Sequence, residues 1–158
     1  MGLLVDGVWQ QDGQRTKDGH FVRPTTAYRN WVTADGSAGP SGSGGFAAEA
    51  GRYHLYVSLS CPWAHRTVIF RKLKGLENVV SMSTVSPDML QDGWTFNKDE
   101  GSSGDDINGK SKLSEVYVLA NPTYTGRVSV PVLWDKKTKT IVNNESSEII
   151  RMFNSAFE

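Results

Sequence analysis

The 158-residue sequence contains one cysteine, Cys61, within the stretch YVSLSCPWAHR at residues 56–66. A β-rich run precedes Cys61 and a helical pattern follows it, so the cysteine is predicted to end a strand and begin a helix. The free N–H groups and partial positive charge at a helix start favour the thiolate, which is the nucleophilic form. Pro62 suits the first helical position and keeps the turn rigid. We therefore predict that Cys61 is catalytic, although many lone cysteines are inert buried residues.

The residues after Cys61 restrict the kind of thiol chemistry. CPWA is a C-x-x-C motif in which Ala64 replaces the second cysteine, so Cys61 cannot resolve its own mixed disulfide. A second thiol must come from solution, which favours a monothiol mechanism. His65 lies near Cys61 on one helical face and is a secondary candidate for a proton partner.

The stretch NNESSEIIRM offers a second feature, a helix start that suits a carboxylate. The hydroxyl of Ser146 and the free amides of the first turn can bind a carboxylate, and Glu145 can hold an ammonium group. An α-amino acid end, such as the γ-glutamyl end of glutathione, carries both charges. Plain capping by Asn144 or Ser146 is the alternative, and it needs no ligand.

Seven predicted elements position these residues. Strand patterns cover residues 53–58, 78–85, 128–135 and 138–143, and helical patterns cover residues 61–75, 111–122 and 145–157. In the first helix, Ala64 and Val68 form an apolar stripe that Ile69 and Leu73 are expected to extend. The order β-α-β-α-β-β-α predicts an α/β, thioredoxin-like domain with one parallel strand pair.

Val130-Pro131 interrupts one of the apolar strand patterns. Proline removes a donor from the sheet, so it is tolerated where a strand begins or where the peptide bond is cis. In a thioredoxin-like sheet this position faces the helix-start cysteine and leaves the Val130 backbone free for a peptide-like ligand. An ordinary edge-strand proline is the alternative.

The remaining segments are polar. Residues 1–52 include ADGSAGPSGSGG at 34–45 and are predicted to be an irregular extension, either draped on the domain formed by residues 53–158 or partly mobile. Aromatic side chains are expected to anchor this extension, namely Trp9, Phe21, Tyr28, Trp31 and Phe46. Residues 97–110 are expected to be a loop too polar to pack.

Composition excludes several classes of protein. The formal net charge is +0, which argues against nucleic-acid and anionic-membrane partners. A single free thiol suits a reducing cytoplasm, and the histidines His20 and His54 lack metal-ligand spacing, so no metal is expected. No apolar run approaches the roughly 20 residues that span a bilayer, and the N-terminus lacks the features of a signal peptide.

Sequence blocks along essentially the whole chain match one known family. They include NWVTADG, RYHLYVSLSCPWAHRT, KGLENVVSMS, GWTF and GRVSVPVLWDKKTKTIVNNESSEIIRMFN. The chain resembles the glutathionyl-hydroquinone reductases, the xi or omega-like class of glutathione transferases. The combination of CPWAHR and NNES is specific to this group.

This resemblance implies a catalytic Cys61, supported by Pro62 and Pro131. It also implies a set of glutathione-binding residues: Trp94, Arg127, Val128, Ser129, Val130, Glu145 and Ser146. Trp94 would cover the tripeptide and Arg127 would hold the glycine carboxylate. From the residues alone, Trp94 could equally be a loop anchor and Arg127 a solvated surface charge.

The resemblance further implies a reaction in which glutathione is the co-substrate and no metal takes part. Cys61 would remove glutathione from a glutathionyl-hydroquinone through a Cys61–glutathione disulfide, giving hydroquinone and glutathione disulfide. Two alternatives are a glutaredoxin-like thiol transferase or dehydroascorbate reductase, and a non-catalytic glutathione-binding module.

The sequence departs from the family pattern at its end. Members of the family continue into an all-helical domain that lines the hydroquinone pocket and supplies most of the homodimer surface, whereas this chain ends at Glu158. We therefore expect an incomplete hydroquinone pocket, an incomplete dimer surface and an exposed apolar face.

Overall fold

The computed structural model of the chain describes residues 2–11, 16–17, 20–21 and 28–157. The elements in chain order are β1 (Leu3–Val5), β2 (Val8–Gln10), β3 (Thr16–Lys17), β4 (His20–Phe21), β5 (Tyr53–Val57), α1 (Pro62–Leu73), β6 (Ser81–Thr84), the 3₁₀ turn η1 (Lys98–Glu100), α2 (Leu113–Ala120), β7 (Gly126–Arg127), β8 (Val132–Asp135), β9 (Thr140–Asn143) and α3 (Ser146–Ser155).

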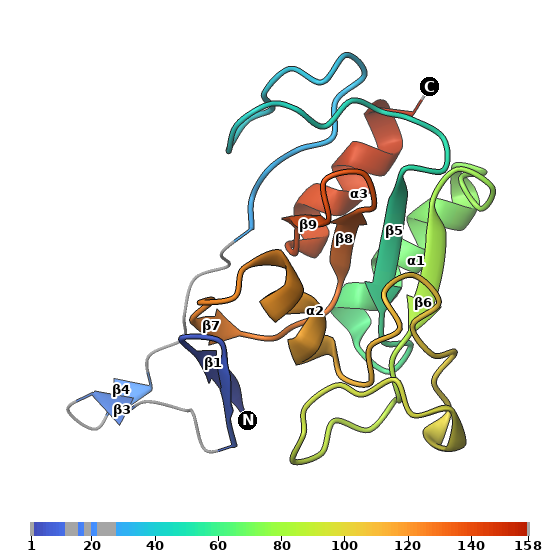
Figure 1. The fold of residues 1–158 in the computed structure, drawn as a ribbon. Helices are drawn as coiled ribbons and strands as arrows, with labels where there is room; N and C mark the ends of the chain where they lie inside the picture. The colour runs from blue at the N-terminus through green and yellow to red at the C-terminus, as the bar shows by residue number, and fades with distance from the viewer. Residues whose placement is uncertain (1, 12–15, 18–19, 22–27, 158) are drawn as a thin grey trace.

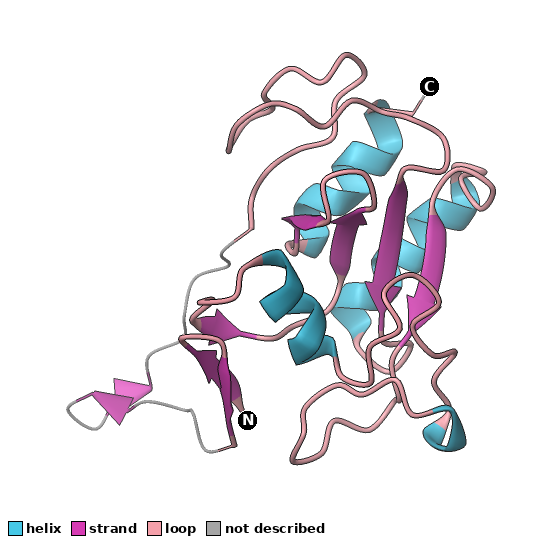
Figure 2. Cartoon of the chain, in the orientation of Figure 1, coloured by secondary structure: helices cyan, strands magenta, loops and turns pink. Residues whose placement is uncertain are grey.

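A four-stranded sheet in the order β6-β5-β8-β9 forms the centre of the molecule. β5 and β6 are parallel, and β8 is antiparallel to both β5 and β9. α1 and α3 pack together on one face of this sheet, and α2 lies on the other face (Figure 1). The order β5-α1-β6-α2-β8-β9-α3 confirms the predicted thioredoxin-like fold, and Figure 2 shows how long loops surround it.

Both faces of the sheet are covered, which explains why its central strands are buried throughout. All five residues of β5 and all four of β8 are buried. From α3, Ile149, Met152 and Phe153 complete the core. No helix in the described residues is long and apolar enough to cross a membrane.

Helix α1 begins at Pro62, as predicted, and is followed by Gly75 with a φ of 66°. Its buried residues are Ala64 and Thr67. The expectation that Ile69 and Leu73 extend the apolar face was wrong, because these side chains are 49% and 75% exposed. At about 100° per residue they lie roughly 140° and 180° around the helix from Ala64.

Strand β6 is shorter than the predicted strand over residues 78–85. The C=O of Leu76 accepts hydrogen bonds from the N–H groups of Val79 and Val80, at 2.9 and 2.8 Å. These residues therefore form a turn, and the strand begins only at Ser81.

The N-terminal segment is more regular than predicted. The β1–β2 hairpin pairs with β7, where Leu4 is buried opposite Gly126. Trp31 and Phe46 are also buried, and Trp9 and Tyr28 are half-buried against the core, whereas the Phe21 side chain lies outside the described part. Segments before residue 53 therefore contribute to the core, and the domain boundary at residue 52 stays a prediction.

The prediction that residues 97–110 are too polar to pack was wrong. The Asp105 carboxylate is 9% exposed and accepts a 2.8 Å hydrogen bond from the Tyr56 hydroxyl. The backbone N–H groups of Ile107, Asn108 and Lys110 also donate to this carboxylate. One buried carboxylate thus satisfies three backbone N–H groups of the loop and packs the loop against β5.

Candidate active site

Cys61 lies at the carboxyl end of β5, immediately before α1. It is the N-cap residue of that helix, with extended backbone angles, and its C=O accepts the 2.9 Å hydrogen bond from His65 N–H. The side chain is half-buried and is not part of a disulfide. Cys61 therefore combines partial access with the partial positive charge of a helix start.

The Val130-Pro131 segment reaches the same edge of the sheet. Its peptide bond is cis, which is one of the two settings predicted for this proline. Val132 pairs with Tyr56 near the end of β5, so the residues just before Val132 continue beyond that end. In the described part of the chain neither the N–H nor the C=O of Val130 has a hydrogen-bond partner.

The start of α3 also lies at this edge, because β9 runs parallel to β5. Glu145, rather than Asn144 or Ser146, is the N-cap residue, and its carboxylate accepts from the N–H and hydroxyl of Ser147. Ser146 is 4% exposed, and no described residue accepts a bond from its N–H.

Arg66 contacts Ser146, and the sequence did not predict this contact. Its Nε and Nη2 atoms donate to the Ser146 hydroxyl oxygen at 3.0 and 2.8 Å, and its guanidinium lies over the Trp63 ring. Because the guanidinium occupies the oxygen lone pairs, the Ser146 O–H hydrogen is left to be donated outward. Arg66 thus ties the helix that begins after Cys61 to the start of α3.

Residues 127–129 are held from behind by tyrosines. The Tyr124 hydroxyl donates to the Arg127 C=O at 2.7 Å, and the Tyr117 hydroxyl bonds both backbone groups of Ser129. The Arg127 guanidinium forms no ion pair within the described residues, so its charge is available to a carboxylate. Val128 is buried and packs into the core.

Trp94 lies in the long loop between β6 and α2. Its C=O accepts from Leu113 N–H at 2.9 Å, and its half-buried ring packs against the core. Ser60 donates to the Pro87 C=O at 2.7 Å, which ties the turn before Cys61 to this loop. No described contact joins Trp94 to Cys61, so its role as a glutathione cover stays a prediction.

The histidines have different environments. His65 is exposed, and its ring makes no hydrogen bond within the described part of the chain. His54 is buried, and its ring nitrogens contact the hydroxyls of Ser81 and Ser83 at 2.6 and 2.7 Å. Among the described residues, which do not include the His20 side chain, no cluster of three or more His, Cys, Asp or Glu side chains could hold a metal.

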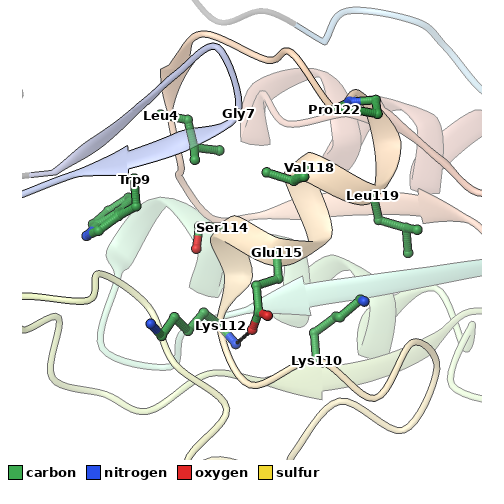
Figure 3. Close-up of a pocket in the computed structure, with 10 residues that line it drawn as sticks. All are labelled: Leu4, Gly7, Trp9, Lys110, Lys112, Ser114, Glu115, Val118, Leu119 and Pro122. Carbon is green, nitrogen blue, oxygen red and sulfur yellow. Dashed lines mark hydrogen bonds between the residues drawn. The ribbon is translucent and has the colours of Figure 1, made fainter.

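A separate hollow of about 530 Å³ lies between the β1–β2 hairpin and α2 (Figure 3). Leu4, Trp9 and Val118 give it an apolar wall, and the buried Ser114 hydroxyl points into it. Cys61 is not among its lining residues, so this hollow is distinct from the predicted active site.

Residues 60–156 match the family described as "Glutathione S-transferase, N-terminal domain". The chain is 59% identical over 161 residues to the glutathionyl-hydroquinone reductase YqjG of Escherichia coli K12, an alignment that covers 100% of this chain and 49% of that protein. It is 51% identical over 160 residues to the glutathionyl-hydroquinone reductase PcpF of Sphingobium chlorophenolicum, covering 100% and 48% of the two chains. The chain thus spans about half the length of these relatives.

Solved structures give the same result. The glutathione-bound structure of E. coli YqjG superposes with a TM-score of 0.86 at 56% identity, covering 98% of this chain and 46% of that one. A xi-class glutathione transferase from Natrialba magadii superposes with a TM-score of 0.83 at 48% identity, covering 99% and 45%. The chain therefore belongs to the glutathione S-transferase family and has the thioredoxin-like fold of its N-terminal domain.

Proposed function

We propose that this chain is the glutathione-binding half of a cytoplasmic glutathionyl-hydroquinone reductase. The observation that carries the proposal is the half-exposed Cys61 at the start of α1, in a domain 59% identical to the reductase YqjG. In this reading Pro62 fixes the turn, and the partial charge of the helix stabilises the thiolate.

Glutathione would bind along the sheet edge beside Cys61. The backbone groups of Val130, which have no partner among the described residues, would pair with the peptide part of the ligand, and Arg127 would hold its glycine carboxylate. The N–H and O–H of Ser146 would receive the γ-glutamyl carboxylate at the start of α3, with Glu145 near the ammonium group. Trp94 would cover the tripeptide.

The reaction proceeds in two thiol steps. The Cys61 thiolate attacks the sulfur of the glutathionyl-hydroquinone, so that a sulfur–sulfur bond forms, the sulfur–carbon bond breaks and the ring carbon takes a proton. A second glutathione then attacks the Cys61–glutathione disulfide and releases glutathione disulfide, restoring the thiolate. The ring is reduced, two glutathione sulfurs are oxidised, and no second protein cysteine is needed.

The hydroquinone and the dimer partner would contact surfaces that this half leaves open. α1 exposes the apolar side chains of Trp63, Ile69 and Leu73, which form the face that the remainder of a full-length reductase would cover. We propose that the hydroquinone ring binds at the end of this face nearest Cys61 and that the full-length enzyme is a homodimer.

Turnover with two substrate types tests the reaction class. We expect a full-length reductase that contains this half to release hydroquinone from a glutathionyl-hydroquinone in the presence of glutathione, and its Cys61→Ser variant to release none. Turnover of a mixed disulfide or of dehydroascorbate without any hydroquinone release would identify a general thiol transferase instead. Glutathione binding without turnover of any of these substrates would indicate a non-catalytic module.

A further inference from the structure

The hydroxyl of Tyr117 joins two segments that the proposed function assigns to glutathione. Tyr117 is fully buried on α2, and its hydroxyl donates to the Ser129 C=O at 2.8 Å. The same oxygen accepts from Ser129 N–H at 3.3 Å and from Asn144 Nδ2 at 3.0 Å. Ser129 precedes Val130, and Asn144 lies two residues before Ser146, so one hydroxyl contacts both segments from behind.

The bonds to Ser129 decide where the next N–H points. The peptide unit between Ser129 and Val130 is planar and trans, so its C=O and N–H point in opposite directions. Since the Ser129 C=O points at the buried Tyr117 hydroxyl, the Val130 N–H must point away from it. That N–H has no partner within the described residues, as expected of a donor that is kept for a ligand.

Asn144 is fixed as firmly on its other side. Its Oδ1 accepts from Tyr28 N–H at 3.3 Å, and its own N–H donates to the Tyr28 C=O at 3.2 Å. The side chain is therefore held between Tyr28 and Tyr117. The Tyr117 hydroxyl consequently sets the position of the chain entering α3 relative to the chain entering β8.

We propose that Tyr117 is a positioning residue for glutathione, resting on the proposed function. Its hydroxyl orients the Val130 N–H toward the ligand and fixes the distance from that N–H to the carboxylate-binding start of α3. Tyr117 itself does not touch the ligand. Its conversion to Phe removes only the oxygen and leaves three polar groups, two on Ser129 and one on Asn144, without this partner.

Calorimetric titration of glutathione into the wild type and Tyr117→Phe tests the proposal. We expect the dissociation constant to rise about tenfold, because buried backbone groups without partners reorient toward new ones. Tyr53→Phe is the matched control. Tyr53 is as fully buried a residue as Tyr117, and its hydroxyl donates to the Ala47 C=O, but it lies at the opposite end of β5. This control should lower the melting temperature without changing glutathione affinity.

Each outcome decides between the two claims. If the wild type binds glutathione and Tyr117→Phe binds equally well, the positioning role is wrong while the proposed function stands. If the wild type itself does not bind glutathione, the proposed function fails. Equal affinity losses in Tyr117→Phe and Tyr53→Phe would show a general stability effect and overturn the proposal. Should Tyr117→Phe not fold, Asn144→Ala must weaken glutathione binding in the same titration, and unchanged affinity there overturns the proposal too.

Discussion

The buried histidine His54 should make the domain lose stability as the pH falls. Burial lowers its pKa from 6.5 to about 4, and the charges of Lys136 and Arg71 act in the same direction while Asp105 opposes them. The neutral ring is satisfied by the Ser81 and Ser83 hydroxyls, which can each donate or accept. Folding therefore favours the unprotonated ring, and protonation favours the unfolded chain.

The size of the effect follows from the two pKa values. The contribution is intact above pH 6.5, is lost as the pH falls toward 4, and totals about 3 kcal/mol for a shift of roughly 2.5 units. At pH 5 the loss is about 2 kcal/mol, because the unfolded histidine is then almost fully protonated and the folded one is not.

Urea unfolding of the wild type and His54→Gln at pH 7.5 and pH 5 measures this loss. The variant should be less stable at pH 7.5, but its free energy of unfolding should fall by about 2 kcal/mol less between the two pH values. Subtracting the change in the variant from the change in the wild type removes the contribution of carboxylates, which titrate in both proteins. Parallel losses in the wild type and His54→Gln would refute the assignment.

Two further predictions concern arginine contacts. Arg66→Lys keeps the charge but loses the two-pronged bond to Ser146, so glutathione should bind roughly fivefold more weakly by calorimetry, whereas the exposed Arg151→Lys should bind normally; equal affinities would contradict the role of Arg66. Arg52→Met leaves the fully buried Asp135 carboxylate without its 2.9 Å partner and should cost about 3 kcal/mol in urea unfolding. Glu49→Gln removes the half-exposed ion pairs that this carboxylate makes with the same arginine and with Lys137, and it should cost under about 1 kcal/mol; equal losses would contradict the assignment.

Patterns in adjacent residues predicted most of the helices and strands of the central domain. Pro62 after a β-rich run predicted the start of α1, because proline acts on its immediate neighbours. The strand patterns over residues 128–135 and 138–143 likewise predicted β8 and β9, because such patterns lie in consecutive residues.

Contacts between distant residues left no such signal. Leu4 pairs with Gly126 in strands of three and two residues, too short to show a period. The burial of Asp105 depends on the Tyr56 hydroxyl, 49 positions away. Composition alone therefore made its loop look unable to pack.

The candidate site also contains both kinds of feature, those predicted from adjacent residues and those formed by contacts between distant residues. Cys61, Val130-Pro131 and the start of α3 were predictable because each feature is coded by adjacent residues. Arg66 bonds Ser146 at a separation of 80 positions, and Tyr117 bonds Asn144 at a separation of 27. The residue types did not predict these two hydrogen-bonded pairs, because their members come together only when the sheet has folded.

The central claim is that Cys61 is a reactive thiol beside a glutathione site, and intact-mass measurement after treatment with oxidised glutathione tests it most directly. The wild type should gain one glutathionyl group, lose it again on addition of reduced glutathione, and the Cys61→Ser protein should gain none. A wild-type mass that stays unchanged under conditions in which the protein is folded would contradict the account.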